Sequence, residues 1–421
     1  MPSRDNIHVI VARYLRDNAY NSTLEAFKEE LGLEDDMIPI PSDHSMTLES
    51  IIEQKRLYDL AMGIQELDIK ADTQNQWVVP SPTFKSVLPD QLSNILFVSV
   101  ANLSMPTSID DPSAGTSVRP CILVTEADRS LRIFDFYTFD PLKVYTHLHS
   151  SPILTLEVLD ENTIMTGGMD GRLVVSKPAT GEITAEQKDH FKYLVKIAIS
   201  KDQKYVATVG YDKKVHVYTI ERSETEPPKF NKIGSLSFPT NPEAAAFTYQ
   251  DGDDEIPKLV ISRRDSTFLY YYKLQPNLIE FARHNLNPES NSWVSFCAMD
   301  IALDPTEQKY LGVATSSIPH MRFMMLESGN DAILKNSFTR APQDAYSTSR
   351  ITWRPEGSGI WCNGDDGLIR GVEVSTGAVV AELKHHQGKV KAIYAGKVDG
   401  KEVVVTGGFD KTVAVWEVEK R

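Results

Sequence analysis

The sequence predicts an all-β fold in which seven four-stranded sheets form a β-propeller, preceded by a small α-helical segment. Three observations lead to this prediction. A pattern of strand, tight turn and strand recurs through most of the chain at intervals of about 40 to 50 residues. Between successive copies there is room for two more short strands, which gives four strands per repeat. In residues 1–38 the apolar period changes from two residues to about 3.6 residues, which is typical of amphipathic helices.

Each copy of the repeat has an apolar strand, a short turn with an aspartate, and a second strand of alternating apolar residues. The clearest copy is "VVVTGGFDKTVAVW", from Val403 to Trp416. The aspartates of six copies are Asp128, Asp170, Asp212, Asp265, Asp366 and Asp410, and a seventh copy has Ser317 near this place. Because a carboxylate that recurs in six turns is better explained by holding the turn than by catalysis, we interpret these residues, with Thr406 and Trp416, as structural.

The last repeat contains only three strands before the chain ends, so an edge of its sheet would be exposed. An uncovered edge presents unpaired N–H and C=O groups that favour aggregation. Two short β-prone segments, Trp77–Val79 and Thr83–Leu88, lie just before the first complete repeat. We therefore predict a propeller over residues 74–421, closed by a strand within residues 76–89.

The repeats resemble the WD-repeat family. The segment "DKTVAVW", Asp410 to Trp416, is similar to the family signature, and histidines precede several first strands as they do in that family. These histidines are His149, His190, and either His385 or His386. The resemblance implies a hydrogen-bonded set of Asp, His, Ser or Thr, and Trp inside a sheet. The set is expected to be most complete in the last sheet, with Asp410, Thr406, Trp416 and one of the two adjacent histidines.

Residues 1–38 are predicted to form two short helices around a turn at Asn18-Ala19. Ser22 and Glu25 have the spacing of a capping box for the second helix. The apolar stripes of the two helices consist of Ile7, Ile10, Val11, Tyr14, Leu15, Tyr20, Leu24 and Phe27. The segment resembles the LisH motif, a small dimerisation module, at Tyr14-Leu15, Ala19-Tyr20, Phe27 and Glu30. The resemblance implies a homodimer through these stripes, and we expect the large apolar side chains of Leu15 and Phe27 to be central to it. Residues 39–73 are predicted to contain a third helix, from 47 to about 67, and a linker.

Composition narrows the classes of function. The net charge of −14 and the pI of about 5.2 argue against direct nucleic-acid binding, because that binding depends largely on Lys and Arg. The sequence contains no run of 18 apolar residues, which is the length expected of a membrane-spanning helix. Three widely separated cysteines suggest neither a disulfide framework nor a zinc site, and a cytoplasmic or nuclear location fits. The sequence predicts no metal site and no cofactor.

No nucleotide-binding loop, catalytic triad or metal-binding cluster is recognisable, so we expect no enzymatic activity. The leading hypothesis is a dimeric scaffold or adaptor that binds peptides or proteins on its propeller. An alternative is a substrate-recruiting subunit of a ubiquitin ligase, or a subunit of a chromatin or corepressor complex. A catalytic propeller with a loop-built active site is the least favoured reading.

Partner binding is predicted on the face that carries the repeated aspartates. The residue before each aspartate is often large where a turn would more easily accept Gly, Asn or Ser. Aromatic residues, Met and Arg are also the types enriched at interfaces. Four residues of the predicted rim, Met169, Tyr211, Arg264 and Phe409, stand directly before an aspartate. The other two, Trp293 and Tyr346, stand just before first strands on the same side. The inserted segments 101–120 and 221–232 are expected to be mobile because they are rich in Pro, Ser and charge.

Overall fold

A computed structural model of the chain describes residues 7–33, 38, 48, 52, 76–88, 93–107, 115–223, 226–249, 256–275, 277–287, 296–306, 308–328 and 332–418. The chain divides into two units, Met1–Lys70 and Ala71–Arg421. The predicted helix over residues 47–67 lies outside the described residues, apart from positions 48 and 52. None of the helices described is long and apolar enough to cross a membrane.

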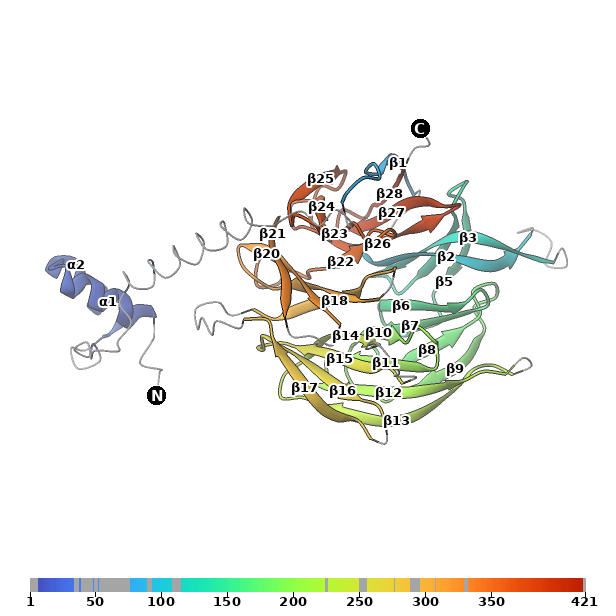
Figure 1. Cartoon of the computed structure of the whole chain (residues 1–421), viewed down its shortest axis with the longest axis horizontal. Helices are drawn as coiled ribbons and strands as arrows, with labels where there is room; N and C mark the ends of the chain where they lie inside the picture. Colours follow the sequence, from blue (N-terminus) through green and yellow to red (C-terminus); the bar gives the residue numbers. More distant parts are fainter. Residues whose placement is uncertain are drawn as a thin grey trace. The chain divides into compact units, whose positions relative to one another are not determined.

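The described part of the second unit forms seven four-stranded antiparallel sheets, the architecture of a seven-bladed β-propeller (Figure 1). Sheet 1 consists of β2 (Ile95–Pro106), β3 (Thr116–Glu126), β4 (Leu131–Asp135) and β5 (Pro141–Tyr145). Sheet 2 consists of β6 (Ile153–Asp160), β7 (Thr163–Gly168), β8 (Leu173–Ser176) and β9 (Ile183–Gln187). Sheet 3 consists of β10 (Leu194–Ile199), β11 (Tyr205–Gly210), β12 (Lys214–Glu221) and β13 (Lys229–Ser237). Sheets 4 and 5 are β14 (Pro242–Thr248), β15 (Lys258–Arg263), β16 (Phe268–Lys273) and β17 (Ile279–Asn285); and β18 (Ala298–Leu303), β19 (Tyr310–Thr315), β20 (His320–Glu327) and β21 (Ile333–Pro342). Sheets 6 and 7 are β22 (Ile351–Trp353), β23 (Gly359–Asn363), β24 (Leu368–Glu373) and β25 (Val379–Lys384); and β26 (Val390–Val398), β27 (Lys401–Gly408), β28 (Val413–Glu417) and β1 (Thr83–Val87).

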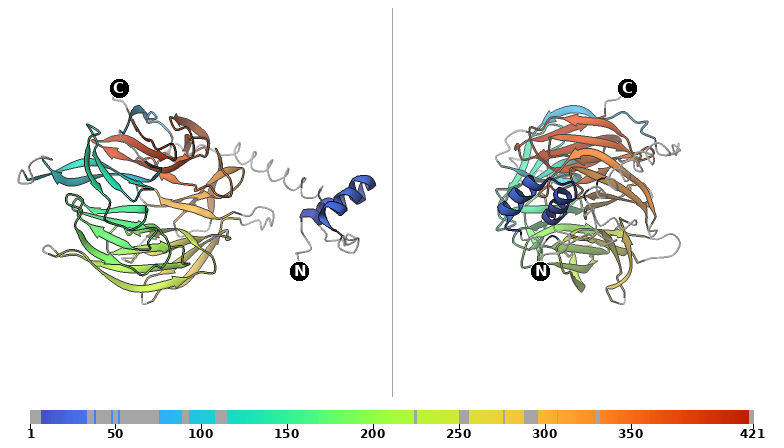
Figure 2. Two further views of the ribbon diagram at one scale, coloured as in Figure 1. Left: turned by 180° about the vertical axis from the view of Figure 1, so that it is seen from behind. Right: turned by 90° about the vertical axis from the view of Figure 1, so that its left-hand side faces the viewer.

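The sheets form a closed ring (Figure 2). The first strand of each sheet contacts the first strand of the next, and β26 contacts β2 to complete the circle. Each junction between neighbouring sheets has its own cluster of buried apolar side chains. The middle strands are covered on both faces, and every residue of β11, Tyr205–Gly210, is buried. Successive side chains of a strand point to opposite faces of its sheet. Alternate residues of a middle strand therefore pack into the junctions on its two sides.

The ring is closed by β1, which pairs with the last strand of the chain. Phe84 lies opposite Trp416 and Val87 opposite Ala414, so the outer edge of β28 is covered. The other β-prone segment forms no strand and instead packs on sheet 6. There the ring of Trp77 makes an edge contact with Trp361, with 5.2 Å between ring centroids. Both segments before the first complete repeat therefore belong to the closure.

The segment 101–120, which the sequence analysis expected to be mobile, is in large part regular strand. Its described ends extend β2 and β3, and the two strands pair as far as Pro106 and Thr116. Residues 108–114 between them lie outside the described residues. The prediction of mobility was wrong for the strand portions. It was based on their content of Pro and Ser, which does not show that β2 and β3 pair with each other.

In the first unit, the described residues form two helices, α1 (Ile7–Asp17) and α2 (Asn21–Leu31), as predicted. The turn lies at the expected place, and Ala19 adopts a φ of 59°, the left-handed region that favours glycine. The capping-box prediction was wrong: α2 begins at Asn21 with Tyr20 as its N-cap, and no side chain caps it. Ser22 therefore lies inside the first turn rather than at the cap.

The two helices share a small apolar core within one chain. Ala12, Leu24 and Ile38 are buried, and Leu15, Phe27 and Leu33 pack against them. Of the remaining residues in the predicted stripes, Ile10 is buried, Val11 and Tyr14 are half-buried and Tyr20 is 51% exposed. The side chain of Ile7 lies outside the described residues. Leu15 and Phe27 thus contact the hairpin's own core, whereas Tyr20 faces solvent.

Candidate functional site: a central cavity with an aromatic mouth

The first strands of the sheets line a central cavity of about 470 Å³. Main contributions come from β2, β6, β10, β22 and β26, which lie side by side around the ring. The Asp-bearing turns supply Met169, Tyr211 and Phe409 at one end. Such a cavity is large enough to admit side chains of a peptide or a small ligand.

Charged side chains from opposite parts of the ring meet in the cavity wall. Asp300 Oδ1 lies 3.4 Å from Lys196 Nζ and 3.4 Å from Arg350 Nη1, so one carboxylate on β18 bridges two cations. Its second oxygen accepts a hydrogen bond from the Ile351 backbone N–H at 3.3 Å. Lys391, on β26, donates to Thr348 Oγ1 at 2.7 Å. Because these residues come from distant repeats, no local motif could reveal the cluster.

One carboxyl group and one ammonium group of this wall have pKa values shifted to near neutral. Burial, together with the charge of Asp300, raises the pKa of Glu157 to about 7, and Lys196 opposes the shift. Burial, together with the charge of Arg350, lowers the pKa of the Lys391 ammonium to about 7, and Glu243 opposes it. The charge of the cavity therefore changes around neutral pH.

The Glu157→Gln variant is expected to be stabilised relative to the native protein at pH 8 but not at pH 5. Because the pKa of Glu157 rises from its ordinary 4.5 to about 7, the folded chain binds more protons than the unfolded chain between these values. Stability consequently falls as the pH rises through this window. The amide does not ionise, so its advantage should grow by on the order of 2 kcal/mol between pH 5 and pH 8. Thermal melts at both pH values test this, with the exposed Glu161→Gln as control; an equal difference at both would contradict it.

The predicted rim residues are only partly brought together. Met169, Tyr211 and Phe409 line the end of the cavity. Arg264 does not line it but is linked to Tyr211 through Glu243. The buried Glu243 carboxylate accepts a 2.9 Å hydrogen bond from the Tyr211 hydroxyl and a 2.7 Å bond from Arg264 Nε. Tyr211 and Arg264 therefore have a structural role in addition to their position at the mouth.

The other two predicted rim residues do not form part of this group. Tyr346 is 92% exposed and does not line the cavity. Trp293 lies outside the described residues. Tyr193, which was not predicted, also lines the cavity, and its ring centroid is 6.5 Å from that of Tyr211. Its loop, just after a histidine that precedes a first strand, was the available signal. We refer to Met169, Tyr193, Tyr211 and Phe409 as the aromatic mouth.

Three sheets contain the same hydrogen-bonded set of His, Asp and Thr. In each, one imidazole nitrogen contacts the turn aspartate and the other contacts a threonine hydroxyl on the second strand. The sets are His149 with Asp170 at 2.9 Å and Thr166 at 2.9 Å, His190 with Asp212 at 2.9 Å and Thr208 at 2.9 Å, and His386 with Asp410 at 3.1 Å and Thr406 at 2.7 Å. The His, Asp and Thr of the predicted set thus recur in sheets 2, 3 and 7. The fourth member, Trp416, belongs to sheet 7, and the equivalent positions in sheets 2 and 3 are Ser176 and Tyr218.

In sheet 7 the structure decides between the adjacent histidines. His386 belongs to the hydrogen-bonded set, whereas His385 stacks on Phe84 of the closing strand with 5.0 Å between ring centroids. Trp416 is buried and lies beside the His386 ring, at 6.3 Å between centroids. The last sheet therefore connects its internal network with the strand that closes the ring.

Electrostatics agree with a structural role for these sets. Burial acts to raise the pKa of Asp170, but the hydrogen bond and charge of His149, with backbone N–H groups of Arg172 and Ser150, lower it to about 2. Burial lowers the pKa of His190 and of His386, although their aspartates oppose the shift. The lowered pKa values of Asp170 and Asp410 keep these two carboxylates ionised at pH 7, and the lowered pKa values of His190 and His386 keep these two rings neutral.

The remaining turn aspartates are held differently. Asp128 accepts bonds from the Ser130 backbone N–H and hydroxyl at 2.9 and 2.6 Å, and Asp366 pairs with Arg370 at 2.6 Å. Asp265 has a φ of 58°, in the left-handed region. The six aspartates thus occupy equivalent turns in six different sheets. Only one group of three metal-ligand side chains occurs among the described residues, formed by His190, Asp212 and His216.

This chain is a β-propeller protein. Its described residues form seven four-stranded sheets around a central cavity, and a strand from near the N-terminus completes the last sheet. Residues 119–417 match the family described as UCP007778, beta-propeller domain, and the chain belongs to that family. The match begins within β3, after the closing strand and β2. No curated protein matches the chain.

Proposed function

We propose that this protein is a non-catalytic scaffold of the WD-repeat type that binds a peptide or protein partner at the aromatic mouth. The observation that carries the proposal is the mouth itself: four large side chains from three sheets converge on one end of the cavity. Tyr193 is 47% exposed and Phe409 44% exposed, although neither is needed for the hydrogen-bonded sets. Exposed aromatic residues around a concavity are typical of interface hot spots.

Two further features support the proposal. The repeated set of His, Asp and Thr in sheets 2, 3 and 7 fits the WD-repeat resemblance of the sequence. In the cavity, Asp300 is engaged by Lys196 and Arg350, so these charges stabilise one another across the ring. Because these three side chains are engaged with one another, this part of the wall supports a fixed binding surface.

Replacement of the two exposed aromatic residues, Tyr193→Ala with Phe409→Ala, is expected to weaken partner binding at least tenfold. Each buried aromatic anchor contributes about 2 kcal/mol or more at a hot spot, and 1.4 kcal/mol corresponds to a tenfold change. The measurement is quantitative affinity purification from the native cell, followed by titration of the recovered partner against the purified variant. A matched control changes Ile279 and Phe281, exposed residues of the outer strand β17, to alanine. An unchanged partner set in the mouth variant would contradict the proposal.

We further propose that residues 1–38 dimerise the protein, as the LisH resemblance implies. Support comes from apolar surface left exposed by the hairpin core: Tyr20 is 51% and Leu31 is 41% exposed. Tyr14 lies beside Tyr20, with 6.3 Å between their ring centroids. Since Leu15 and Phe27 pack inside the hairpin, the proposed interface is centred on Tyr14 and Tyr20.

Under this proposal, Tyr14→Asp with Tyr20→Asp converts a dimer into a monomer. Charges placed in an apolar interface are costly to desolvate, so the dissociation constant should rise by at least a hundredfold. Light scattering coupled to gel filtration gives the mass, and circular dichroism checks that the helices persist. The exposed Glu29→Ala serves as control. Dimers of the double variant at low micromolar concentration would refute this interface.

A further inference from the structure

Sheet 3 differs from the other two sheets that contain the His–Asp–Thr set at the strand position opposite the threonine. The strand position opposite the threonine is Val174 in sheet 2 and Ala414 in sheet 7. In sheet 3 the same position, opposite Thr208, is His216. The repeats therefore supply an internal comparison: the same network occurs twice with a small apolar neighbour and once with a second imidazole.

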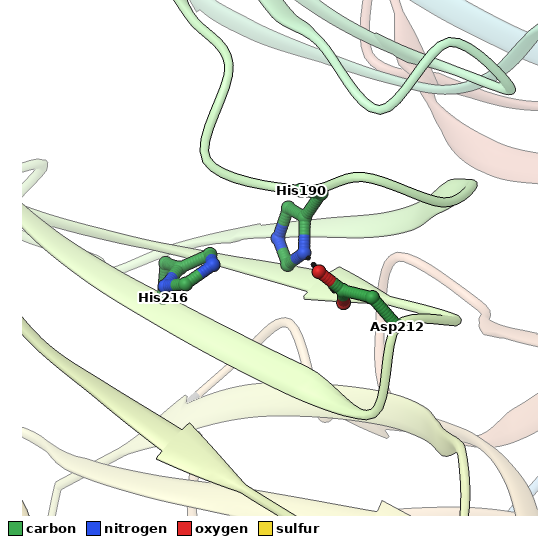
Figure 3. A group of neighbouring side chains, drawn as sticks. All are labelled: His190, Asp212 and His216. Carbon is green, nitrogen blue, oxygen red and sulfur yellow. Dashed lines mark hydrogen bonds and ion pairs between the residues drawn. The ribbon is translucent and has the colours of Figure 1, made fainter.

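His216 is buried beside His190 with an unsatisfied nitrogen. His216 is only 2% exposed. The centroid of its imidazole ring lies 4.4 Å from that of His190 (Figure 3). Nδ1 lies 2.8 Å from the Ser235 hydroxyl on the neighbouring strand β13. Nε2 is buried and has no hydrogen-bond partner among the described residues. A buried polar atom left unpaired is costly, so this nitrogen requires an explanation.

The unpaired nitrogen belongs to a group that has the composition of a metal site. One ring nitrogen of His190, one of His216 and a carboxylate oxygen of Asp212 all lie within 4.8 Å of one another. Figure 3 shows the three side chains facing a common space between the loop before β10 and strand β12. Zinc binds imidazole nitrogen and carboxylate oxygen at about 2.0–2.2 Å, so small side-chain rotations would bring all three into coordination.

Two hydroxyl groups are placed to orient the imidazoles as ligands. Thr208 Oγ1 is 2.9 Å from His190 Nε2, and Ser235 Oγ is 2.8 Å from His216 Nδ1. If each hydroxyl accepts an N–H from its histidine, His190 Nδ1 and His216 Nε2 are left with free lone pairs. On binding, the proton of His190 moves from Nδ1, where it faces Asp212, to Nε2. Hydrogen bonds of this kind fix the tautomer of metal-bound histidine.

We propose that His190, His216 and Asp212 bind a divalent transition-metal ion of the zinc type, with water completing the coordination. Imidazole and carboxylate donors suit zinc and its neighbours better than calcium or magnesium, which prefer oxygen alone. The ion would join the loop that contains His190 to strands β11 and β12. Since Tyr193 follows three residues after His190, the site would also fix one side of the aromatic mouth.

The test uses the full-length chain, stripped of metal with a chelator and titrated with Co²⁺ as a spectroscopic probe for zinc. We expect one tightly bound ion per chain, with the visible absorption of a cobalt ion bound to nitrogen and oxygen ligands. His216→Val, which reproduces the arrangement around Val174, should abolish this absorption. His385→Ala, which removes a histidine outside the group, should leave it unchanged.

Elemental analysis after zinc loading and dialysis gives a second readout. Zinc should raise the Tm of the native chain by several degrees and leave the Tm of His216→Val unchanged. His216→Gln provides a further variant, because glutamine keeps a polar group near Ser235 if valine packs poorly. The proposal is overturned if the native chain binds no Co²⁺ or Zn²⁺, or if both His216 variants bind with native stoichiometry. In either case His216 is a packing residue.

Discussion

Replacement of Arg354 by methionine is expected to destabilise the propeller by about 3–5 kcal/mol. The Arg354 side chain is completely buried, and its guanidinium contacts both carboxylate oxygens of Glu402 at 3.1 Å from Nε. It also donates to the Val79 and Pro80 carbonyl oxygens at 3.2 and 3.3 Å. One side chain thus links sheet 6, sheet 7 and the segment that leads into the closing strand.

The size of the effect follows from the partner left behind. Glu402 is only 4% exposed. Without Arg354, its carboxylate loses the guanidinium and keeps the 2.9 Å hydrogen bond from the Trp361 indole N–H. An unpaired buried charge costs more than the ion pair contributes. The guanidinium also lies 3.9 Å from the centroid of Trp77, so a cation–π contact is lost with it.

Urea denaturation of Arg354→Met measures the loss, and the double variant Arg354→Met with Glu402→Gln is its matched control. Glutamine retains an acceptor for Trp361 but has no charge, so the double variant should recover part of the stability. A single variant within about 1 kcal/mol of native, or a double variant less stable than the single one, would show that the pair does not hold this junction.

Deletion of residues 1–90 is expected to cause aggregation, whereas deletion of residues 1–70 should leave a folded propeller. The shorter deletion removes the first structural unit and retains both Trp77 and β1. The longer deletion exposes the outer edge of β28, whose N–H and C=O groups pair with β1 in the native chain. It also removes the Trp77 ring from above Trp361. Exposed strand edges are templates for pairing with other chains.

Gel filtration and dynamic light scattering of the two truncated chains measure this difference. Trp77→Ala in the full-length chain separates the contributions, because it removes the packing on sheet 6 but keeps β1. We expect it to cost about 3 kcal/mol without aggregation. If the 1–90 deletion were as monodisperse as the 1–70 deletion, closure by β1 would not be required for a stable ring.

Much of the candidate site could be located from the sequence, although not its composition. The position before each turn aspartate pointed to Met169, Tyr211 and Phe409, which do line one end of the cavity. Tyr193 was missed, although it stands three residues after His190 and its carbonyl oxygen accepts a hydrogen bond from the Tyr211 backbone N–H. The charge cluster around Asp300 could not be inferred, because Lys196 and Arg350 approach it from β10 and from the residue before β22 only when the ring is complete.

Elements that depend on local pattern could be predicted from the amino-acid sequence. Alternating apolar residues, turns with aspartate and the missing fourth strand of the last repeat predicted seven sheets and the segment that closes them, because strand formation and tight turns depend on neighbours close in sequence. The helical period of residues 7–31 likewise predicted α1 and α2.

Contacts between these elements became known only from the folded chain. It selected His386 over His385 for the hydrogen-bonded set, turned Leu15 and Phe27 toward the hairpin core, and placed His216 beside His190. His385 and His386, for example, have the same propensity to form a strand or a turn. They differ only in which neighbours their side chains contact in the folded chain. That choice depends on side chains brought together by packing from distant parts of the chain, which no local period specifies.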